Sequence, residues 1–195
     1  MFFHFYSLYS TQEVKIIIFI LILVLKSIKI VTQSEVLIVE RLGKYKETLN
    51  AGFHLVVPFI DKARYRLSLR TMQIDSPPHP AITSDNVSIN IDTVAFYKIT
   101  DPVKAIYEVN HLEEAIKAIT VTTLRDVIGS MELDTTFTSR DKINNKLSLE
   151  LDKATDPWGV KIERVEVKNI NPPEDVREAM EAQMRAERNK RAAIL

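Results

Sequence analysis

Residues 84–102 read SDNVSINIDTVAFYKITDP, and this segment decides the fold. Apolar and polar side chains alternate with a period of two from Val87 to Ile99, which predicts a β-strand with one buried face. Residues 84–86 are typical of a turn before that strand. Asp101-Pro102 suits the N-cap and the first position of a helix. The segment therefore predicts a strand that leads directly into a helix, as in an α+β fold.

The sequence downstream of this strand predicts two longer helices and a last strand. Apolar residues spaced three and four apart mark the first of these helices, which we expect to end at Gly129. Thr138 and Asp141 have the spacing of a capping box and predict the start of the next helix. The last strand, residues 160–167, changes its buried face, so we expect a β-bulge near Glu163-Arg164.

A final helix follows Asn171-Pro172-Pro173 and carries little apolar surface. Such a helix is rarely stable alone. Its narrow apolar stripe therefore predicts an assembly helix or the start of a coiled coil, formed by Val176, Met180 and Met184. The basic residues from Arg185 to Arg191 are interpreted most simply as a solvated helix face rather than as a lipid or RNA site.

Residues 31–75 have the pattern of short strands and turns. The run VLIV at 36–39 is compact and β-branched, and a second run resumes at residues 53–57 and stops at Pro58. Its large apolar residues have two interpretations: they alternate into the core, which we favour, or they form a tip that enters the edge of a membrane. In the second case the contact residues are Phe53, Leu55 and Phe59. Pro77-Pro78-His79-Pro80 is stiff and extended, and predicts a subdomain boundary.

An unbroken apolar run near the N-terminus predicts a membrane anchor. Ten helical residues cover about 15 Å of a hydrocarbon core of about 30 Å, whereas residues 14–31 would cover about 27 Å. We therefore predict an uncleaved transmembrane helix within residues 1–31, in preference to a buried soluble helix or a cleaved signal peptide. Basic residues are denser after the run than before it, which predicts that the rest of the chain faces the cytoplasm. The run consists of Ile16, Ile17, Ile18, Phe19, Ile20, Leu21, Ile22, Leu23, Val24 and Leu25.

Composition and motifs speak against several classes of function. Lys+Arg and Asp+Glu number 26 each, so the chain lacks the basic excess with which proteins neutralise nucleic-acid phosphates. There is no cysteine, the four histidines lack metal-ligand spacing, and the four glycines form no phosphate-binding loop. Glu132 and Asp134 are interpreted best as solvated loop carboxylates. We predict no enzyme, no catalytic residue, no metal site and no cofactor.

Five stretches of the sequence, each weak alone, follow one another in a specific order. They are VERLGKYKETLNAGFHLVVPFID (39–61), AITSDNVSINIDTVAFYKITDP (81–102), LRDVIGSMELD (124–134), DPWGVKIERVEVKNINPP (156–173) and AERNKRAAIL (186–195). In this order they resemble the stomatin–prohibitin–flotillin (SPFH, or band 7) family, and most of all its paraslipin or stomatin-like branch. The resemblance covers roughly residues 31 to 195.

The resemblance implies an α+β domain in two subdomains, and together with the anchor predicted above it gives the chain three parts. The first is the N-terminal transmembrane helix (1–31). The second is an SPFH domain of two α/β subdomains with a mostly antiparallel sheet (32–171, divided into about 32–78 and 79–171). The third is the start of a long C-terminal assembly helix (172–195). Members of the family continue this helix well beyond the segment that ends here at Leu195, so we expect a truncated chain.

The resemblance also implies a function. It describes a membrane-anchored oligomeric scaffold, expected at the bacterial inner membrane, that organises membrane microdomains and regulates membrane proteases in protein quality control. The implied partners are further copies of the chain, membrane lipids, and a membrane-bound protease or an NfeD-like membrane protein, with no nucleic acid. A monomeric peripheral lipid-binding module is the alternative, and a membrane-anchored enzyme is the third hypothesis.

Overall fold

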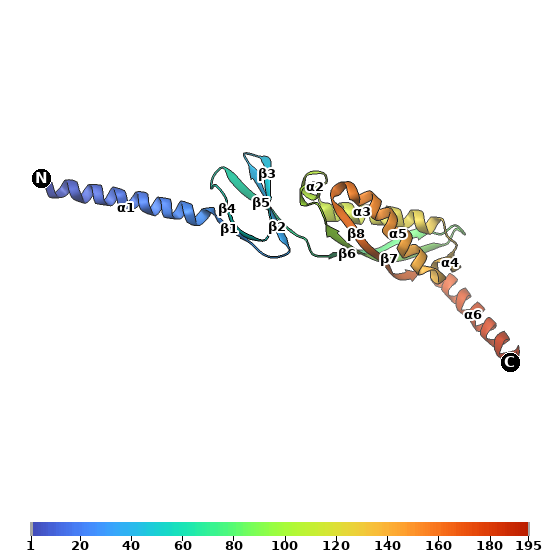
Figure 1. Cartoon of the computed structure of the whole chain (residues 1–195). Helices are drawn as coiled ribbons and strands as arrows, with labels where there is room; N and C mark the ends of the chain where they lie inside the picture. Colours follow the sequence, from blue (N-terminus) through green and yellow to red (C-terminus); the bar gives the residue numbers. More distant parts are fainter. Residues whose placement is uncertain (1, 195) are drawn as a thin grey trace. The chain divides into compact units, whose positions relative to one another are not determined.

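The computed structural model describes the backbone of residues 2–194 and the side chains of residues 12–186, 188–190 and 192. The chain divides into two compact units, Met1–Arg70 and Thr71–Leu195, and Figure 1 shows the elements of each. From the sequence we predict a subdomain boundary at the proline-rich segment 77–80. In the structure this segment lies within a strand of the second unit. Pro77 and Pro78 lie at an irregularity in the pairing, and Pro80 is tolerated because the strand is at the edge of its sheet.

The first unit contains two small antiparallel β-structures. Its elements are α1 (Phe2–Ser27), β1 (Ile28–Val31), β2 (Glu35–Arg41), β3 (Lys44–Leu49), β4 (Gly52–Leu55) and β5 (Asp61–Ser68). Strands β3, β2 and β5 form one sheet with β2 in the centre, whereas β1 and β4 form a two-stranded ribbon. A shared core joins sheet and ribbon, and it consists of Val31, Leu37, Val39, Leu49 and Val56, with Ala63 packed against it.

The predicted N-terminal transmembrane helix is wrong. In the part of the chain that the structure describes, none of the helices is both long enough and apolar enough to cross a membrane. The predicted span needed residues 28–31 as helix, but α1 ends at Ser27 and these residues pair with β4 instead. Two contacts favour the strand: the Ser27 carbonyl accepts a hydrogen bond of 2.8 Å from the Val56 N–H, and Val31 enters the core.

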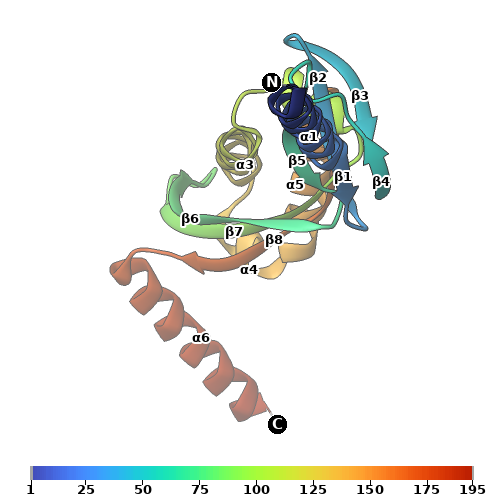
Figure 2. The same ribbon diagram turned by 90° about the vertical axis from the view of Figure 1, so that its left-hand side faces the viewer.

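The second unit is a three-stranded sheet with helices packed against it. The strands are β6 (Met72–Ile82), β7 (Ser88–Ile99) and β8 (Val160–Asn171), ordered β6-β7-β8 with both pairs antiparallel. The helices are α2 (Pro102–Tyr107), α3 (Leu112–Gly129), α4 (Leu133–Thr138), α5 (Arg140–Thr155), the short 3-10 helix η1 (Asp156–Trp158) and α6 (Glu174–Ile194). Helix α3 packs against β6 and α5 packs against β8 (Figure 2). The predicted α+β class with an antiparallel sheet is confirmed.

The strand that decides the fold behaves as its pattern predicts. The apolar face of β7 is buried, although Asp92 of the other face is buried as well; the members of the apolar face are Ile89, Ile91, Thr93, Ala95, Tyr97 and Ile99. The pairing with β8 shifts between Phe96 and Tyr97, which leaves Glu163 as the extra residue and confirms the predicted bulge. A second shift, between Asp92 and Thr93, was not predicted.

The helix caps follow the predictions only in part. The Asp101 carboxylate accepts hydrogen bonds from the N–H groups of Val103 and Lys104 at 3.0 and 3.2 Å, so the predicted cap of α2 is confirmed. The predicted capping box at Thr138 is wrong. Helix α5 begins after Ser139, and the Thr138 hydroxyl donates to the Asp134 carbonyl of α4 at 2.9 Å. The Thr138 hydroxyl therefore bonds within the short helix α4, directly upstream, and does not cap α5.

Candidate functional site

One face of the β1–β4 ribbon is apolar and exposed. Ile30 pairs with Phe53, and Ile28 pairs with Leu55. Directly paired residues of antiparallel strands lie on the same face, and so do residues two apart along one strand. Phe53 is 62% exposed and Leu55 66% exposed, whereas Val31 on the opposite face is buried in the core. The ribbon therefore covers the core with one face and presents large apolar side chains to its surroundings with the other.

Two turns add further apolar side chains next to the ribbon. Leu42 lies between β2 and β3 and is 83% exposed, and Phe59 lies between β4 and β5 and is 78% exposed. The turns are neighbours because the Leu42 N–H donates a hydrogen bond of 3.4 Å to the Ile60 carbonyl. We call the exposed side chains of the ribbon and the two turns the apolar surface. Its members are Ile30, Leu42, Phe53, Leu55, Val57, Phe59 and Ile60.

The backbone is strained at both tips of this surface. Leu42 has φ 51° and Phe59 has φ 74°, in the left-handed region that large side chains seldom occupy. Such a conformation costs on the order of 1 kcal/mol or more and persists only where its surroundings hold it. Neither side chain recovers this cost by burial within the unit. Strain of this kind concentrates at functional sites, so the two tips are candidates for contact with a partner.

A buried carboxylate holds the loop that carries Phe59. The Asp61 side chain is fully buried and accepts hydrogen bonds from Arg41 Nε (2.6 Å) and Nη2 (3.0 Å), Lys46 Nζ (3.1 Å) and the Val57 N–H (3.3 Å). The hydrogen bond from Arg41 lowers the pKa of Asp61 far below its usual value. Burial opposes this shift, and Lys46 and Val57 reinforce it. The carboxylate thus ties residues 57–61 to strands β2 and β3.

The three predicted membrane-edge residues all belong to the apolar surface. Phe53, Leu55 and Phe59 are exposed, so the favoured interpretation of them as core residues is wrong. Their contact with a membrane stays a prediction. The sequence analysis missed Ile30, because it lies in a stretch that resembled the end of an anchor helix. It also missed Leu42, although a large apolar residue directly before Gly43 in a predicted turn is a usable signal.

The predicted anchor residues form part of α1. Each side chain from Ile16 to Leu25 is exposed except Leu23, which is half-buried. A helix that is apolar on all sides is normally covered by lipid or by protein. The structure of the first unit leaves this segment without such a cover in the residues that it describes.

The predicted assembly residues lie four apart along α6. Val176 and Met180 are half-buried, and Met184 is 50% exposed. Around them the helix is charged, with the Glu174–Arg177 pair near its start and the Glu181–Arg185 pair at 3.5 Å further along. Their role in self-association stays a prediction.

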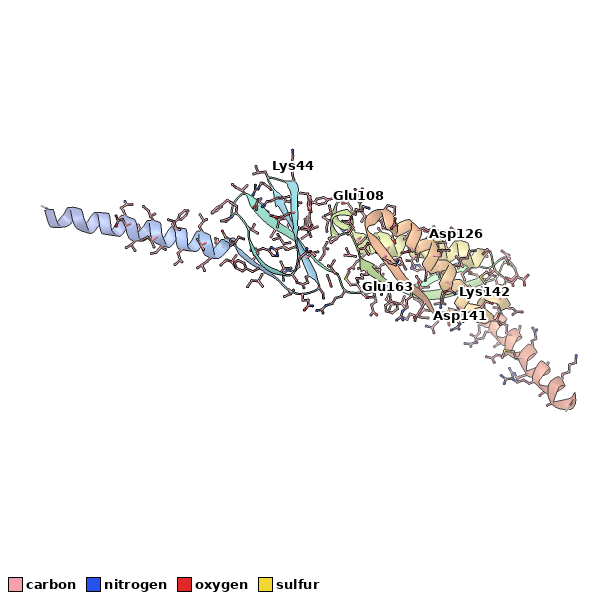
Figure 3. The ribbon with its side chains drawn as sticks, viewed as in Figure 1. Lys44, Glu108, Asp126, Asp141, Lys142 and Glu163 are labelled. Carbon is pink, nitrogen blue, oxygen red and sulfur yellow. The ribbon has the colours of Figure 1, made fainter. Side chains whose placement is uncertain are left out.

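The remaining polar residues suggest no reactive centre. Glu132 and Asp134 are exposed at the start of α4. The charged residues labelled in Figure 3 (Lys44, Glu108, Asp126, Asp141, Lys142 and Glu163) are exposed and come from scattered elements. Within the described residues, no group of three or more His, Asp or Glu side chains could hold a metal ion. The apolar surface is therefore the most distinctive candidate site of the described chain.

Comparison with known proteins identifies the family of the chain. A sequence model of the SPFH domain / Band 7 family matches residues 29–195. A stomatin homolog of Pyrococcus horikoshii is 40% identical over 179 residues, which cover 92% of this chain and 67% of that protein. A stomatin-like protein of Caenorhabditis elegans is 39% identical over 168 residues, which cover 86% of this chain and 52% of that protein.

A protein of Mycobacterium tuberculosis whose name assigns no function is 45% identical over 180 residues, which cover 92% of this chain and 47% of that protein. The chain thus spans about half the length of this relative.

Proposed function

The chain belongs to the SPFH domain / Band 7 family, whose members are generally membrane-associated scaffolds without enzymatic activity, and we propose that it acts as an oligomeric scaffold at a membrane surface. The observation that carries this proposal is the apolar surface. Soluble monomers rarely expose so many large apolar side chains together, and such patches mark contacts with proteins or membranes.

The apolar surface is suited to shallow insertion into the interfacial layer of a bilayer. Phe53, Leu55 and Phe59 are each more than 60% exposed, so each would leave water on insertion. Transfer of one such side chain out of water contributes about 1.5–3 kcal/mol when complete. Amphipathic elements at membranes bury their apolar side about 5–10 Å into the headgroup region, a depth that these side chains can reach.

Helix α1 supplies a second contact. We propose that lipid covers the apolar side chains Ile16–Leu25, since the first unit does not. We further propose the cytoplasmic face of the membrane, in bacteria that of the inner membrane, as the surface. Basic residues follow the apolar segment closely at Lys26, Lys29 and Arg41, and the cytoplasmic leaflet is rich in anionic lipid.

Self-association and recruitment complete the proposed function. The apolar stripe of α6 supports assembly into a homo-oligomer, because a mostly charged helix gains stability when its few apolar residues are shared between copies. The oligomer would organise the lipid beneath it into a microdomain. It would also gather a membrane-bound protease or an NfeD-like membrane protein, and regulate it. The support for this last step is family membership alone.

Vesicle flotation of the full chain tests the membrane contact. We expect binding to vesicles of phosphatidylcholine, and binding at least about tenfold weaker for the double variant Phe53→Ser/Leu55→Ser, because two apolar side chains no longer leave water. The matched control is Ile82→Ser/Leu149→Ser, which removes two apolar side chains that are 58% and 56% exposed in the second unit. Equal losses in both variants, or no loss in the first, would contradict the proposal.

A monomeric lipid-binding module is the second candidate. It is favoured because the apolar surface belongs entirely to the first unit, whereas α6 belongs to the second. One copy of the first unit thus contains all residues of the proposed membrane contact. Mass photometry of the vesicle-bound or detergent-solubilised chain separates the two candidates. A scaffold gives masses of several subunits, whereas a module that binds lipid as a monomer gives the mass of one.

A further inference from the structure

A pocket lies where α1 meets the ribbon in the first unit. It has a volume of about 530 Å³. Its apolar lining consists of Leu25, Ile28, Val56, Pro58 and Ala63. Two lysines, Lys26 and Lys29, line it as well, one from the last turn of α1 and one from β1. This volume lies within the range of about 300–1,000 Å³ in which proteins bind small ligands or parts of larger ones.

The junction that shapes the pocket is held by backbone contacts. The Ser27 hydroxyl donates to the Leu23 carbonyl at 3.1 Å, which closes the last turn of α1. The Val56 N–H donates to the Ser27 carbonyl at 2.8 Å, which joins the end of α1 to the end of β4. Lys26 and Lys29 are therefore attached to a defined backbone on either side of a fixed junction.

The charge of the two lysines is not balanced within the pocket. Asp61 is the acidic residue of the lining, but its oxygens are already bonded to Arg41 and Lys46. In the described part of the chain, neither Lys26 nor Lys29 forms a salt bridge with a carboxylate. The pocket thus combines two positive charges that lack an acidic partner with an apolar wall.

The surroundings of the pocket are apolar on two sides. Leu25 of its lining is the last residue of the exposed apolar run of α1. Ile28 of its lining pairs with Leu55 of the apolar surface. A ligand in this pocket would therefore have both lipid-covered segments of the proposed function as neighbours.

From these contacts we propose that the pocket binds the phosphate group of an anionic phospholipid, with Lys26 and Lys29 holding the headgroup and the apolar wall taking the start of an acyl chain. The inference rests on the proposed membrane contact. It deepens that contact by assigning Lys26 and Lys29 to one defined pocket, in which they hold a single phosphate group beside an apolar wall. A free phosphate would use the lysines only, whereas a phospholipid uses the lysines and the wall together.

Flotation with two vesicle compositions tests this inference. The full chain is mixed with vesicles of phosphatidylcholine alone, or with vesicles in which part of it is replaced by phosphatidylglycerol. We expect tighter binding to the mixed vesicles. Lys26→Gln/Lys29→Gln should lose about fivefold in affinity per lysine, about 25-fold for the pair, on the mixed vesicles only. Binding to phosphatidylcholine should stay unchanged, and circular dichroism checks that the variant folds.

The matched control is Lys62→Gln/Lys98→Gln. It removes the same charge from two exposed lysines outside the pocket. If the control loses as much affinity as the pocket variant, attraction of the whole basic surface explains the selectivity and the pocket assignment is overturned. The assignment is also overturned if the pocket variant keeps its preference for phosphatidylglycerol.

Competition with soluble phosphate distinguishes a phospholipid headgroup from free phosphate as the ligand of the pocket. Inorganic phosphate at millimolar concentration should not displace the chain from mixed vesicles, because it cannot use the apolar wall. Displacement would make the pocket a phosphate site and exclude the lipid assignment. The proposed function fails separately, if the wild-type chain does not bind phosphatidylcholine vesicles. In that case a lysine-dependent preference for phosphatidylglycerol would still support the pocket.

Discussion

At the scale of single residues, the loop that presents Phe59 depends on the Asp61 carboxylate. This group accepts hydrogen bonds from Arg41, Lys46 and the Val57 N–H, and its own side chain is fully buried. When one partner of a buried ion pair is removed, the charge of the other partner is left uncompensated. This destabilises the fold more than the intact pair stabilises it. The strained conformation of Phe59 needs such a support, because large residues avoid positive φ.

Replacement of Asp61 by Asn tests this support. We expect the thermal midpoint of the first unit to fall by roughly 5 °C or more, because Arg41 and Lys46 lose the negative carboxylate that both of them bind. Binding to phosphatidylcholine vesicles should weaken in parallel, as the loop 57–61 loosens. Asp75→Asn is the control: Asp75 forms an exposed pair with Lys168, so its loss should change the midpoint little. Similar effects of the two variants would contradict a special role for Asp61.

The same carboxylate predicts a dependence of stability on acid pH. Its pKa in the folded chain is lowered, chiefly by the hydrogen bond from Arg41. A group whose folded pKa is depressed stabilises the fold above its unfolded pKa, here about 3.9, and loses this effect as the pH falls towards the folded pKa. The midpoint of the wild type should therefore fall more steeply below about pH 4 than that of Asp61→Asn. Thermal melts at a series of pH values measure the difference.

At the scale of elements, the turn between η1 and β8 depends on Gly159. Its φ is +67°, and its carbonyl accepts hydrogen bonds from the N–H groups of Thr100 and Asp101, both at 2.9 Å. A Cβ at this position would lie 2.6 Å from Asp101 Cβ and from the Asp101 carbonyl oxygen. Because Gly159 has no Cβ, it can lie close to Asp101. Its carbonyl can therefore bind the two N–H groups between the end of β7 and the start of α2.

Gly159→Ala should therefore destabilise the second unit by about 2 kcal/mol or more, through both the positive φ and the collision with Asp101. Gly129→Ala is the matched control in the same unit. Its Cβ would meet only the Ile82 carbonyl oxygen at 3.7 Å, an ordinary contact, and the residue ends helix α3. We expect this control to be neutral or to stabilise by about 0.5 kcal/mol. Urea unfolding followed by circular dichroism compares the two, and a control as harmful as Gly159→Ala would refute the explanation.

The elements that the sequence predicted correctly are those with strong local signals. Strand β7 has a period of two, and α2 has Asp101 and Pro102 at its start, so neighbouring residues alone determine them. Strand β1 was missed because its residues, IKIV, continue an apolar run and suit a helix end or a strand equally. Only pairing with β4, more than twenty positions away, makes them a strand. Long-range pairing of this kind leaves no local signature.

The candidate site was predicted to the same limited extent. Phe53, Leu55 and Phe59 were identified, but burial was favoured over exposure, because alternating apolar residues usually point into a core. The ribbon has only two strands, so one of its faces covers the core and the other has no layer of the same unit against it. The pocket beside α1 could not be predicted at all, since its lining comes from α1, β1, β5 and the loop after β4.

At the scale of the whole molecule, the two units carry different parts of the proposed function. The first contains the apolar surface and the lysine pocket, and the second contains α6. A single copy would contact lipid through a few side chains only. Linked copies bind a surface far more tightly than one copy does, because after the first contact each further contact is intramolecular. Self-association through α6 should therefore strengthen membrane binding without adding any lipid contact to the subunit.

Met180→Glu tests this coupling. Met180 is the middle residue of the apolar stripe of α6, and a charge there should weaken self-association by about tenfold or more per interface. Mass photometry should then show smaller assemblies, and flotation should show weaker binding to vesicles although the apolar surface is intact. Ala182→Glu adds the same charge two residues further on, about 200° around the helix and so nearly opposite Met180, and should change neither result. Smaller assemblies with unchanged vesicle binding would instead indicate that each subunit binds the membrane independently.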